Sequence, residues 1–339
     1  MLLNKMTRLN AIQFISLICI ITLGLITFIG CGGGGGDSGP ASSITYTGIT
    51  TQADITDTNA QTLSAGALTG GQAGSAFGGI GTVETGPDEN PVSFRTLKVT
   101  QALEDALLQV DLSSVTGGAS IGATQSDNGS VSGTCGGSAS YTMQYNDQTG
   151  VFSGNFSFSS YCSGGVTLSG GASFSGLVDI SDPNNPTFES FTFTFTHLSD
   201  GSSTLDGTID IDLSSSPAIV TFGALLKDNA SGKVYWVKDY DMSITEGTDG
   251  GGSYVELDIL SGSYYDPDYG YITVETTTPV KTYDTDEWPS DGVIIVTGNS
   301  NHKVRLSALD ETQCRIDADL DGDGNYDEWG PVDKNWTDL

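Results

Sequence analysis

The chain has 339 residues, with 12 Lys and Arg against 42 Asp and Glu, which gives a formal net charge of −30 at pH 7. Charged residues make up only 16% of the chain and hydrophobic residues 37%, a balance that supplies a core and excludes a disordered acidic tail. No nucleic-acid partner is expected, because contacts to phosphates need clustered Lys and Arg.

The N-terminus has the layout of a secretion signal. Lys5 and Arg8 precede an apolar run over residues 11–29, and Gly30-Cys31 follows it. This segment resembles the signal peptide of bacterial lipoproteins. The resemblance implies cleavage after residue 30, attachment of lipid to Cys31 and a stable membrane anchor. In that family a residue other than aspartate after the cysteine, here Gly32, implies delivery to the outer membrane of a Gram-negative cell.

Residues 31–50 are predicted to form a flexible tether behind the lipidated cysteine. Residues 32–36 are all glycine, and a short stretch rich in Ser, Gly and Pro follows. Such a composition orders no structure of its own. The alternative for residues 11–29 is a transmembrane helix, since the run is about long enough to cross a bilayer. The glycine tether favours the lipoprotein interpretation.

Two helices are predicted near the N-terminus of the mature chain. A capping-box spacing that starts at Thr58 predicts a helix near 58–68, with Gly70-Gly71 as its end. Apolar residues at three- and four-residue steps predict a second helix over 94–111.

From about residue 138 the hydrophobic period changes to two, which is typical of strands with one apolar and one polar face. The alternating apolar positions include Tyr141, Met143, Tyr145, Phe156, Phe158, Phe191, Phe193, Phe195, Leu205, Ile209 and Ile211. Turn-forming segments separate the runs and predict an antiparallel meander. The predicted fold is mainly β with a minor α component: one domain over residues 51–339, with about ten strands in a curved sheet, an open barrel or a sandwich. A membrane barrel is the alternative, but the chain ends in Thr337-Asp338-Leu339 rather than in the aromatic residue that such barrels carry.

Three cysteines remain after removal of the signal peptide and lipidation of Cys31. Cys135 and Cys162 lie symmetrically about a turn over residues 146–150, so strands over 138–145 and 151–161 would bring the two sulfurs together. In an oxidising compartment this placement predicts a cross-strand disulfide. The alternative is three small buried hydrophobic residues, and Cys314 has no assigned partner.

An acidic segment over residues 317–328 resembles the calcium loop of EF-hands. Its oxygen-bearing residues are Asp317, Asp319, Asp321, Asp323, Asn325, Asp327 and Glu328. Carboxylates at alternate positions around a glycine turn suit Ca²⁺, which takes six to eight oxygen ligands. Registers that start at Asp317 and at Asp319 both match part of the motif. The predicted cofactor is therefore a structural Ca²⁺; the alternative is a solvated acidic turn.

A candidate binding surface lies in the segment over residues 264–271, where exposed tyrosines beside acids would suit a carbohydrate or protein ligand. Its residues are Tyr264, Tyr265, Asp266, Asp268, Tyr269 and Tyr271. The alternative is a turn with ordinary aromatic packing.

No catalytic motif stands out, and His197 and His302 are the only imidazoles. The leading functional prediction is a non-catalytic binding or structural module at the cell envelope. The alternatives are a carbohydrate-active hydrolase, which requires an acid pair about 5 to 9 Å apart, and an amphiphile carrier, which requires an apolar cavity.

Overall fold

The computed structural model describes residues 44–78, 102, 106, 124–146, 148–179, 187–283, 285–286 and 288–339. The predicted signal peptide, Cys31 and the first part of the tether lie outside these residues. The predicted helix over 94–111 also lies outside them, except for Ala102 and Ala106, which are helical and buried. None of the helices that are described has the length and hydropathy needed to span a bilayer.

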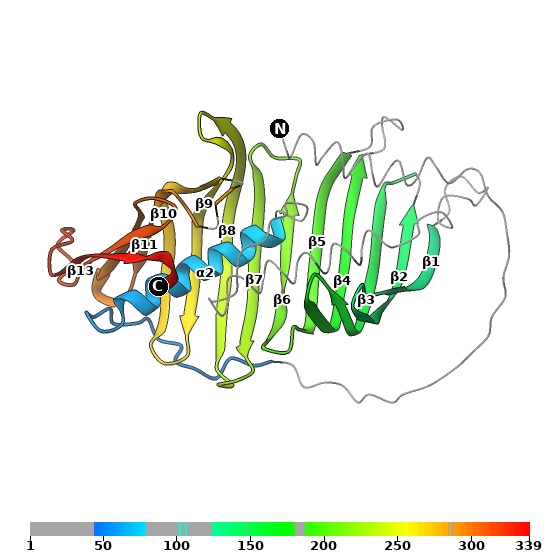
Figure 1. Cartoon of the computed structure of the whole chain (residues 1–339), viewed down its shortest axis with the longest axis horizontal. Coiled ribbons are helices and arrows are strands. Elements are labelled where there is room, and N and C mark those ends of the chain that lie inside the picture. The colour runs from blue at the N-terminus through cyan, green and yellow to red at the C-terminus, as the bar shows by residue number, and fades with distance from the viewer. Residues whose placement is uncertain are drawn as a thin grey trace.

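The described chain forms one antiparallel sheet of 14 strands whose order in the sheet equals their order in the chain. Figure 1 shows this sheet as a single extended layer that runs from β1 to the C-terminal strands. The strands are β1 Thr124–Ser132, β2 Gly136–Asn146, β3 Val151–Ser163, β4 Val166–Asp179, β5 Thr187–Ser199, β6 Ser203–Asp212, β7 Ala218–Asp228, β8 Val234–Asp249, β9 Gly252–Asp266, β10 Gly270–Tyr283, β11 Asp291–Thr297, β12 Lys303–Ala308, β13 Gln313–Asp319 and β14 Trp329–Asn335. Two short 3₁₀ turns, Asn299–Asn301 and Trp336–Asp338, lie near the C-terminus.

The predicted antiparallel meander is confirmed, and the sheet is open. The prediction of about ten strands was too low. Strand β1, with the sequence TQSDNGSVS, contains a single large apolar residue, Val131. It therefore shows no alternation of apolar and polar residues, and it is a strand because it pairs with β2 along its whole length.

The helix α2 spans Ala60–Gly78 and covers the core face of the sheet over β6–β9, β11 and β12. In Figure 1 it crosses these strands obliquely. The predicted end at Gly70-Gly71 was wrong, because the helix continues for two further turns. These glycines let the helix approach the sheet: a Cβ at Gly70 would lie 3.1 Å from the ring of Tyr240, and one at Gly71 would lie 2.8 Å from Ile259.

The start of α2 also differs from the predicted capping box. The helix begins at Ala60, one residue after Asn59, whose side-chain oxygen accepts from the backbone N–H of Thr56 at 2.8 Å. Gln61, the expected partner in the box, instead donates to the carbonyl of Asp338 at 2.9 Å. This contact joins the helix to the C-terminal turn.

Aromatic side chains fill the core face of β3–β5. The rings of Phe156, Phe174 and Phe193 are buried in adjacent strands, with centroids 5.7 Å and 6.2 Å apart. A Cβ at Gly154 would lie 2.4 Å from the ring of Phe174, so the glycine makes room for that ring within the strand. The alternation predicted from Phe and Ser residues therefore produces one aromatic face and one hydroxyl face.

The N-terminal strap, residues 44–53, begins on the opposite, solvent face of the sheet, and residues 51–53 then pair with the start of β10. The amide of Ile44 donates to Asp206 of β6 at 3.0 Å, and the amide of Ala53 donates to the carbonyl of Tyr271 in β10 at 2.8 Å. Between these contacts the ring of Tyr46 packs against Trp236 and Tyr265. Residues 44–50, assigned to the flexible tether from composition, are thus ordered against the sheet.

Cys135 and Cys162 form a disulfide at the open end of the β2–β3 hairpin, with their Cα atoms 5.1 Å apart. The predicted pairing is seen, and the two hairpin strands extend slightly beyond their predicted bounds. Cys314 is a free thiol, buried in β13. Burial raises the pKa of this thiol to about 11, so the group packs as a small apolar residue.

Candidate functional site

The acidic loop joins β13 to β14 and begins with a buried carboxylate. Asp319, the last residue of β13, is fully buried. Its two oxygens accept from the amides of Gly322 at 2.7 Å and Gly324 at 2.9 Å. Both glycines have positive φ values of 77° and 92°, a conformation that side chains disfavour. The chain therefore folds back over Asp319.

Three carboxylates meet at this turn. Asp319, Asp321 and Glu328 each offer an oxygen, and these oxygens lie within 4.8 Å of one another. Glu328 is held in place because its Oε2 accepts from the amide of Leu320 at 3.1 Å. The cluster contains oxygen donors and no Cys or His, which is the chemistry preferred by Ca²⁺ or Mg²⁺.

The other four predicted metal ligands are not brought into this cluster. Asp317 lies in β13 and binds Arg305 of β12 through two hydrogen bonds of 2.9 Å and 2.7 Å. Asp323 accepts from the backbone and the side chain of Asn325, at 2.8 Å and 2.9 Å. Asp327 is exposed. The geometry thus matches neither register in full. Asp319, Asp321 and Glu328 stand at positions 3, 5 and 12 of the register that starts at Asp317, whose first residue is engaged by Arg305, and the register that starts at Asp319 has Gly330 at position 12.

The predicted tyrosine-rich surface over residues 264–271 is divided between the two faces of the sheet. Tyr264 is buried on the core face, and Asp266 is also buried. On the solvent face the ring of Tyr265 stacks on Trp236, with the ring centroids 4.6 Å apart, and the ring of Tyr271 lies beside Tyr265, with centroids 5.1 Å apart. These rings are half-buried and are joined there by Tyr46 of the strap.

The last two members of this predicted surface lie at the turn between β9 and β10. Asp268 forms an ion pair with Lys233, and Tyr269 is exposed. Most of the segment is therefore packed aromatic structure rather than an open surface.

Burial raises the pKa values of several groups in and around the segment over residues 264–271. It is the main cause that raises the pKa of Tyr46 to about 12, and the nearby charge of Asp266 adds to the effect. Burial likewise raises the pKa of the Asp266 carboxyl, and it raises the pKa of Tyr264 well above its ordinary value. The phenols of Tyr46 and Tyr264 stay protonated at neutral pH, and that of Tyr46 donates to the carbonyls of Ile49 and Asp266.

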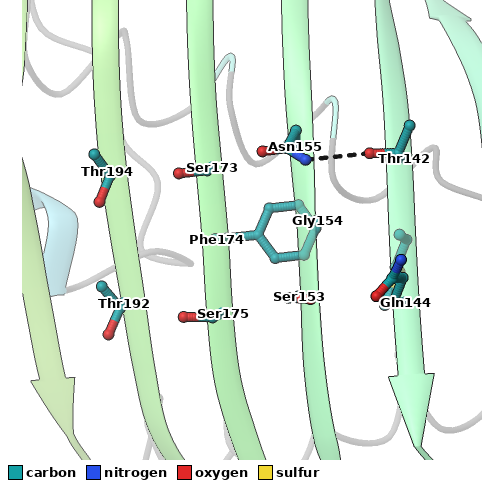
Figure 2. A pocket seen from close by; sticks show the side chains of 11 residues that line it. Thr142, Gln144, Ser153, Gly154, Asn155, Ser173, Phe174, Ser175, Thr192 and Thr194 are labelled. Carbon is teal, nitrogen blue, oxygen red and sulfur yellow. Dashed lines mark hydrogen bonds between the residues drawn. The ribbon is translucent and has the colours of Figure 1, made fainter. Parts of the chain in front are cut away.

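A third feature is a shallow concavity on the solvent face of β2–β5, with a volume of about 340 Å³. Its polar lining residues are Thr142, Gln144, Ser153, Asn155, Ser173, Ser175, Thr192 and Thr194. Met143, Gly154 and Phe174 lie between these positions along the strands and complete the lining. Figure 2 shows the hydroxyl and amide groups spread over four neighbouring strands. We refer to this feature as the polar concavity.

The strand register arranges these side chains in two rows that cross the strands. One row contains Gln144, Ser153, Ser175 and Thr192, and the other contains Thr142, Asn155, Ser173 and Thr194. None of these side chains is charged. The site has no signature in the sequence, because each strand contributes only an ordinary polar face and the rows exist only once the four strands are in register.

The two histidines of the chain lie away from the polar concavity. His197 is near the end of β5, with its Nε2 3.5 Å from an oxygen of Asp206. His302 follows the 3₁₀ turn over Asn299–Asn301. Neither belongs to the lining of the polar concavity.

No protein-family model, curated protein or solved structure matches this chain. Its class is therefore defined by the fold and the sites alone: an open antiparallel meander with a polar concavity at one end and an acidic loop at the other.

Proposed function

We propose that the chain is an exported, lipid-anchored binding module of the outer membrane that carries out no chemical reaction. The observation that carries this proposal is the chemistry of the polar concavity. Its lining supplies hydroxyl and amide groups, which donate and accept hydrogen bonds, but no carboxylate, imidazole, amine or thiol. General acid–base and nucleophilic catalysis both need such titratable or activated groups. The concavity is thus suited to holding a ligand without transforming it.

The two alternative functions receive less support from the described residues. A glycoside hydrolase needs an acid pair in a cleft. The carboxylates that converge here, Asp319, Asp321 and Glu328, lie on a turn outside the concavity. An amphiphile carrier needs an apolar cavity, whereas the concavity that is described has mainly polar walls.

The anchor is supported by the residues that precede the strap. The strap holds the chain from Ile44 onward against the sheet, and in the proposed lipoprotein residues 32–43 would join it to the acylated Cys31. Fully extended, such a link reaches about 3.3 to 3.6 Å per residue. An acylated Cys31 would therefore hold the sheet close to the bilayer surface.

The proposal is tested by expressing the full chain and its Cys31→Ser variant in a Gram-negative host. We expect the mature wild-type protein to begin at an acylated Cys31. The wild-type protein should fractionate with the outer membrane, and the variant should be released from it. The purified protein should co-sediment with isolated envelope material without generating new reducing ends. An uncleaved, unacylated N-terminus, or steady release of sugar, would refute this function.

We also propose a structural calcium site formed by Asp319, Asp321 and Glu328. Oxygen ligands on a tight glycine-containing loop favour this cation. The three carboxylates also lie so close together that they repel one another until a cation neutralises them. The ion would fix the loop between β13 and β14 rather than take part in chemistry.

A further inference from the structure

We infer that the polar concavity binds an uncharged polysaccharide, laid across strands β2–β5. This inference rests on the proposed binding function and names the chemistry of the ligand. It is carried by three properties of the site: the unengaged hydroxyl groups at its centre, the fixed groups at its rim, and a lining without charged side chains.

The rim of the concavity is held by hydrogen bonds between neighbouring strands. On one side the amide of Asn155 donates to the hydroxyl of Thr142 at 3.3 Å, drawn as a dashed line in Figure 2. On the other side Thr192 donates to Asp210 at 2.6 Å, and the hydroxyls of Thr194 and Thr208 are 3.2 Å apart. These bonds restrict the rim side chains before any ligand arrives, which lowers the entropy lost on binding.

The centre of the concavity differs from the rim. Within the part of the chain that the structure describes, the hydroxyl groups of Ser153, Ser173 and Ser175 have no hydrogen-bond partner, and neither does the amide of Gln144. Each hydroxyl can donate one hydrogen bond and accept two, and the amide can do both. Groups with this dual capacity match the hydroxyl groups of sugars, which also donate and accept.

No charged side chain belongs to the lining of the concavity. Strands β2 and β3 contain no Asp, Glu, Lys or Arg, and the one carboxylate bonded to the lining is that of Asp210 in β6, which accepts a hydrogen bond from Thr192 at the rim. This neutral field lies on a chain with a formal net charge of −30, which repels polyanions at long range. A neutral ligand meets no such barrier and leaves no unpaired charge buried.

The spacing of the rows favours a polymer over a single sugar. Neighbouring strands lie about 4.7–4.9 Å apart, and alternate residues along a strand about 6.5–7 Å apart, so the hydroxyl groups repeat on a regular grid. The two rows continue the same pairing through four strands. A chain of repeated sugar units can present hydroxyls to several of these positions at once, which adds weak contacts together.

The test is affinity electrophoresis of the purified full chain in gels that contain one polysaccharide each. The neutral probes are dextran, laminarin and galactomannan, and the charged probes are alginate and polygalacturonate. We expect retardation by at least one neutral polymer and by neither charged polymer. Retardation that is equal in charged and neutral gels, or that is absent with all three neutral polymers, would overturn the inference.

Matched variants locate the site. Ser153→Ala/Ser175→Ala removes two paired hydroxyls inside the concavity, and Ser140→Ala/Ser157→Ala removes two paired hydroxyls on the same face outside it. Loss of two neutral hydrogen bonds should weaken binding about tenfold in the first variant. The second should change binding by less than about twofold. Equal loss in both variants would also overturn the inference, with equal thermal midpoints confirming that both fold.

This result is separable from the test of the proposed function. A protein that is acylated at Cys31 and co-sediments with envelope material, but is retarded by none of the neutral polymers, would keep the proposed function and lose its inferred ligand.

Discussion

Arg305 and Asp317 face each other directly across strands β12 and β13, and the guanidinium group holds both carboxylate oxygens, at 2.9 Å and 2.7 Å. Asp317 is buried, so this pairing satisfies a charge that has lost its water. The same guanidinium lies 4.5 Å from the ring centre of Tyr326 in the acidic loop. One arginine therefore removes Asp317 from the set of predicted metal ligands and supports the loop from the adjacent strand.

We predict that Arg305→Ala lowers the free energy of unfolding by about 2 kcal/mol, because it leaves a buried carboxylate without its partner. The matched control is Arg315→Ala. Arg315 binds Asp333 of β14 with the same two-pronged geometry, at 2.7 Å and 3.0 Å, but both side chains are exposed. Arg315→Ala should leave the free energy of unfolding, measured with urea, almost unchanged. Equal destabilisation by the two variants would show that burial of Asp317 is not the cause.

Calcium is predicted to stabilise the protein through the acidic loop. With an affinity in the weak extracellular range of about 10⁻⁴ to 10⁻³ M, 10 mM Ca²⁺ should add about 1.4–2.7 kcal/mol to the free energy of unfolding. Asp321→Asn/Glu328→Gln should abolish this gain. Asp323→Asn/Asp327→Asn, with the same change of charge in the same loop, should retain it. Thermal unfolding with and without Ca²⁺ at fixed ionic strength measures the effect, and a wild-type protein indifferent to Ca²⁺ would rule the site out.

The contact between α2 and the sheet leads to a prediction about Gly66. A Cβ at this position would lie 2.3 Å from the ring of Tyr264, which is buried. Alanine improves helix propensity by about 1 kcal/mol over glycine, but overpacking of a core costs about 1–3 kcal/mol. The clash should win, so Gly66→Ala is expected to lower the thermal midpoint. Thr62→Ala, at an exposed position of the same helix, should raise it slightly. A more stable Gly66→Ala protein would mean that the helix can shift away from the sheet.

Alkaline pH is predicted to release the N-terminal strap. The pKa of Tyr46 is raised from 10.0 to about 12, chiefly by burial, so the folded state retains this proton where the unfolded state loses it. The resulting stabilisation is complete below about pH 10 and is lost as the pH rises toward 12. The hydroxyl also donates to the carbonyls of Ile49 and Asp266, at 2.8 Å and 2.9 Å, and ionisation removes both bonds.

The strap release can be followed by limited proteolysis near residues 44–53 between pH 9 and 12, with Tyr46→Phe as the comparison. Because phenylalanine cannot ionise, the variant should show a lower protection at pH 9 but a flatter dependence on pH. Parallel pH curves for the two proteins would remove Tyr46 as the titrating group.

The sequence predicted best where alternation was strong and turns were short. The hairpin of β2 and β3 was predicted almost to its bounds, because Tyr141 and Phe156 alternate with hydroxyl residues on either side of one turn. Its disulfide followed from the same symmetry. Strands with few apolar residues, such as β1 and β14, could not be found this way, since their pairing with a neighbour fixes them rather than their own pattern.

Features that depend on contacts between distant segments of the chain could not be predicted from the sequence. Gly70-Gly71 has the local signature of a helix end, yet here it provides close contact with the sheet. Asp317 fits a calcium motif in the chain, and only the register of β12 with β13 shows that Arg305 engages it. The polar concavity needs four strands in register, so no single segment announces it.

The order of the sheet has a consequence for how such a protein changes over generations. Each strand is bonded only to the strands that precede and follow it in the chain. Deleting or duplicating one complete hairpin therefore leaves the flanking strands antiparallel and adjacent, with no connection to rethread. The width of the layer is a quantity that gene rearrangement could shorten or lengthen in steps of two strands while the two ends keep their separate chemistries.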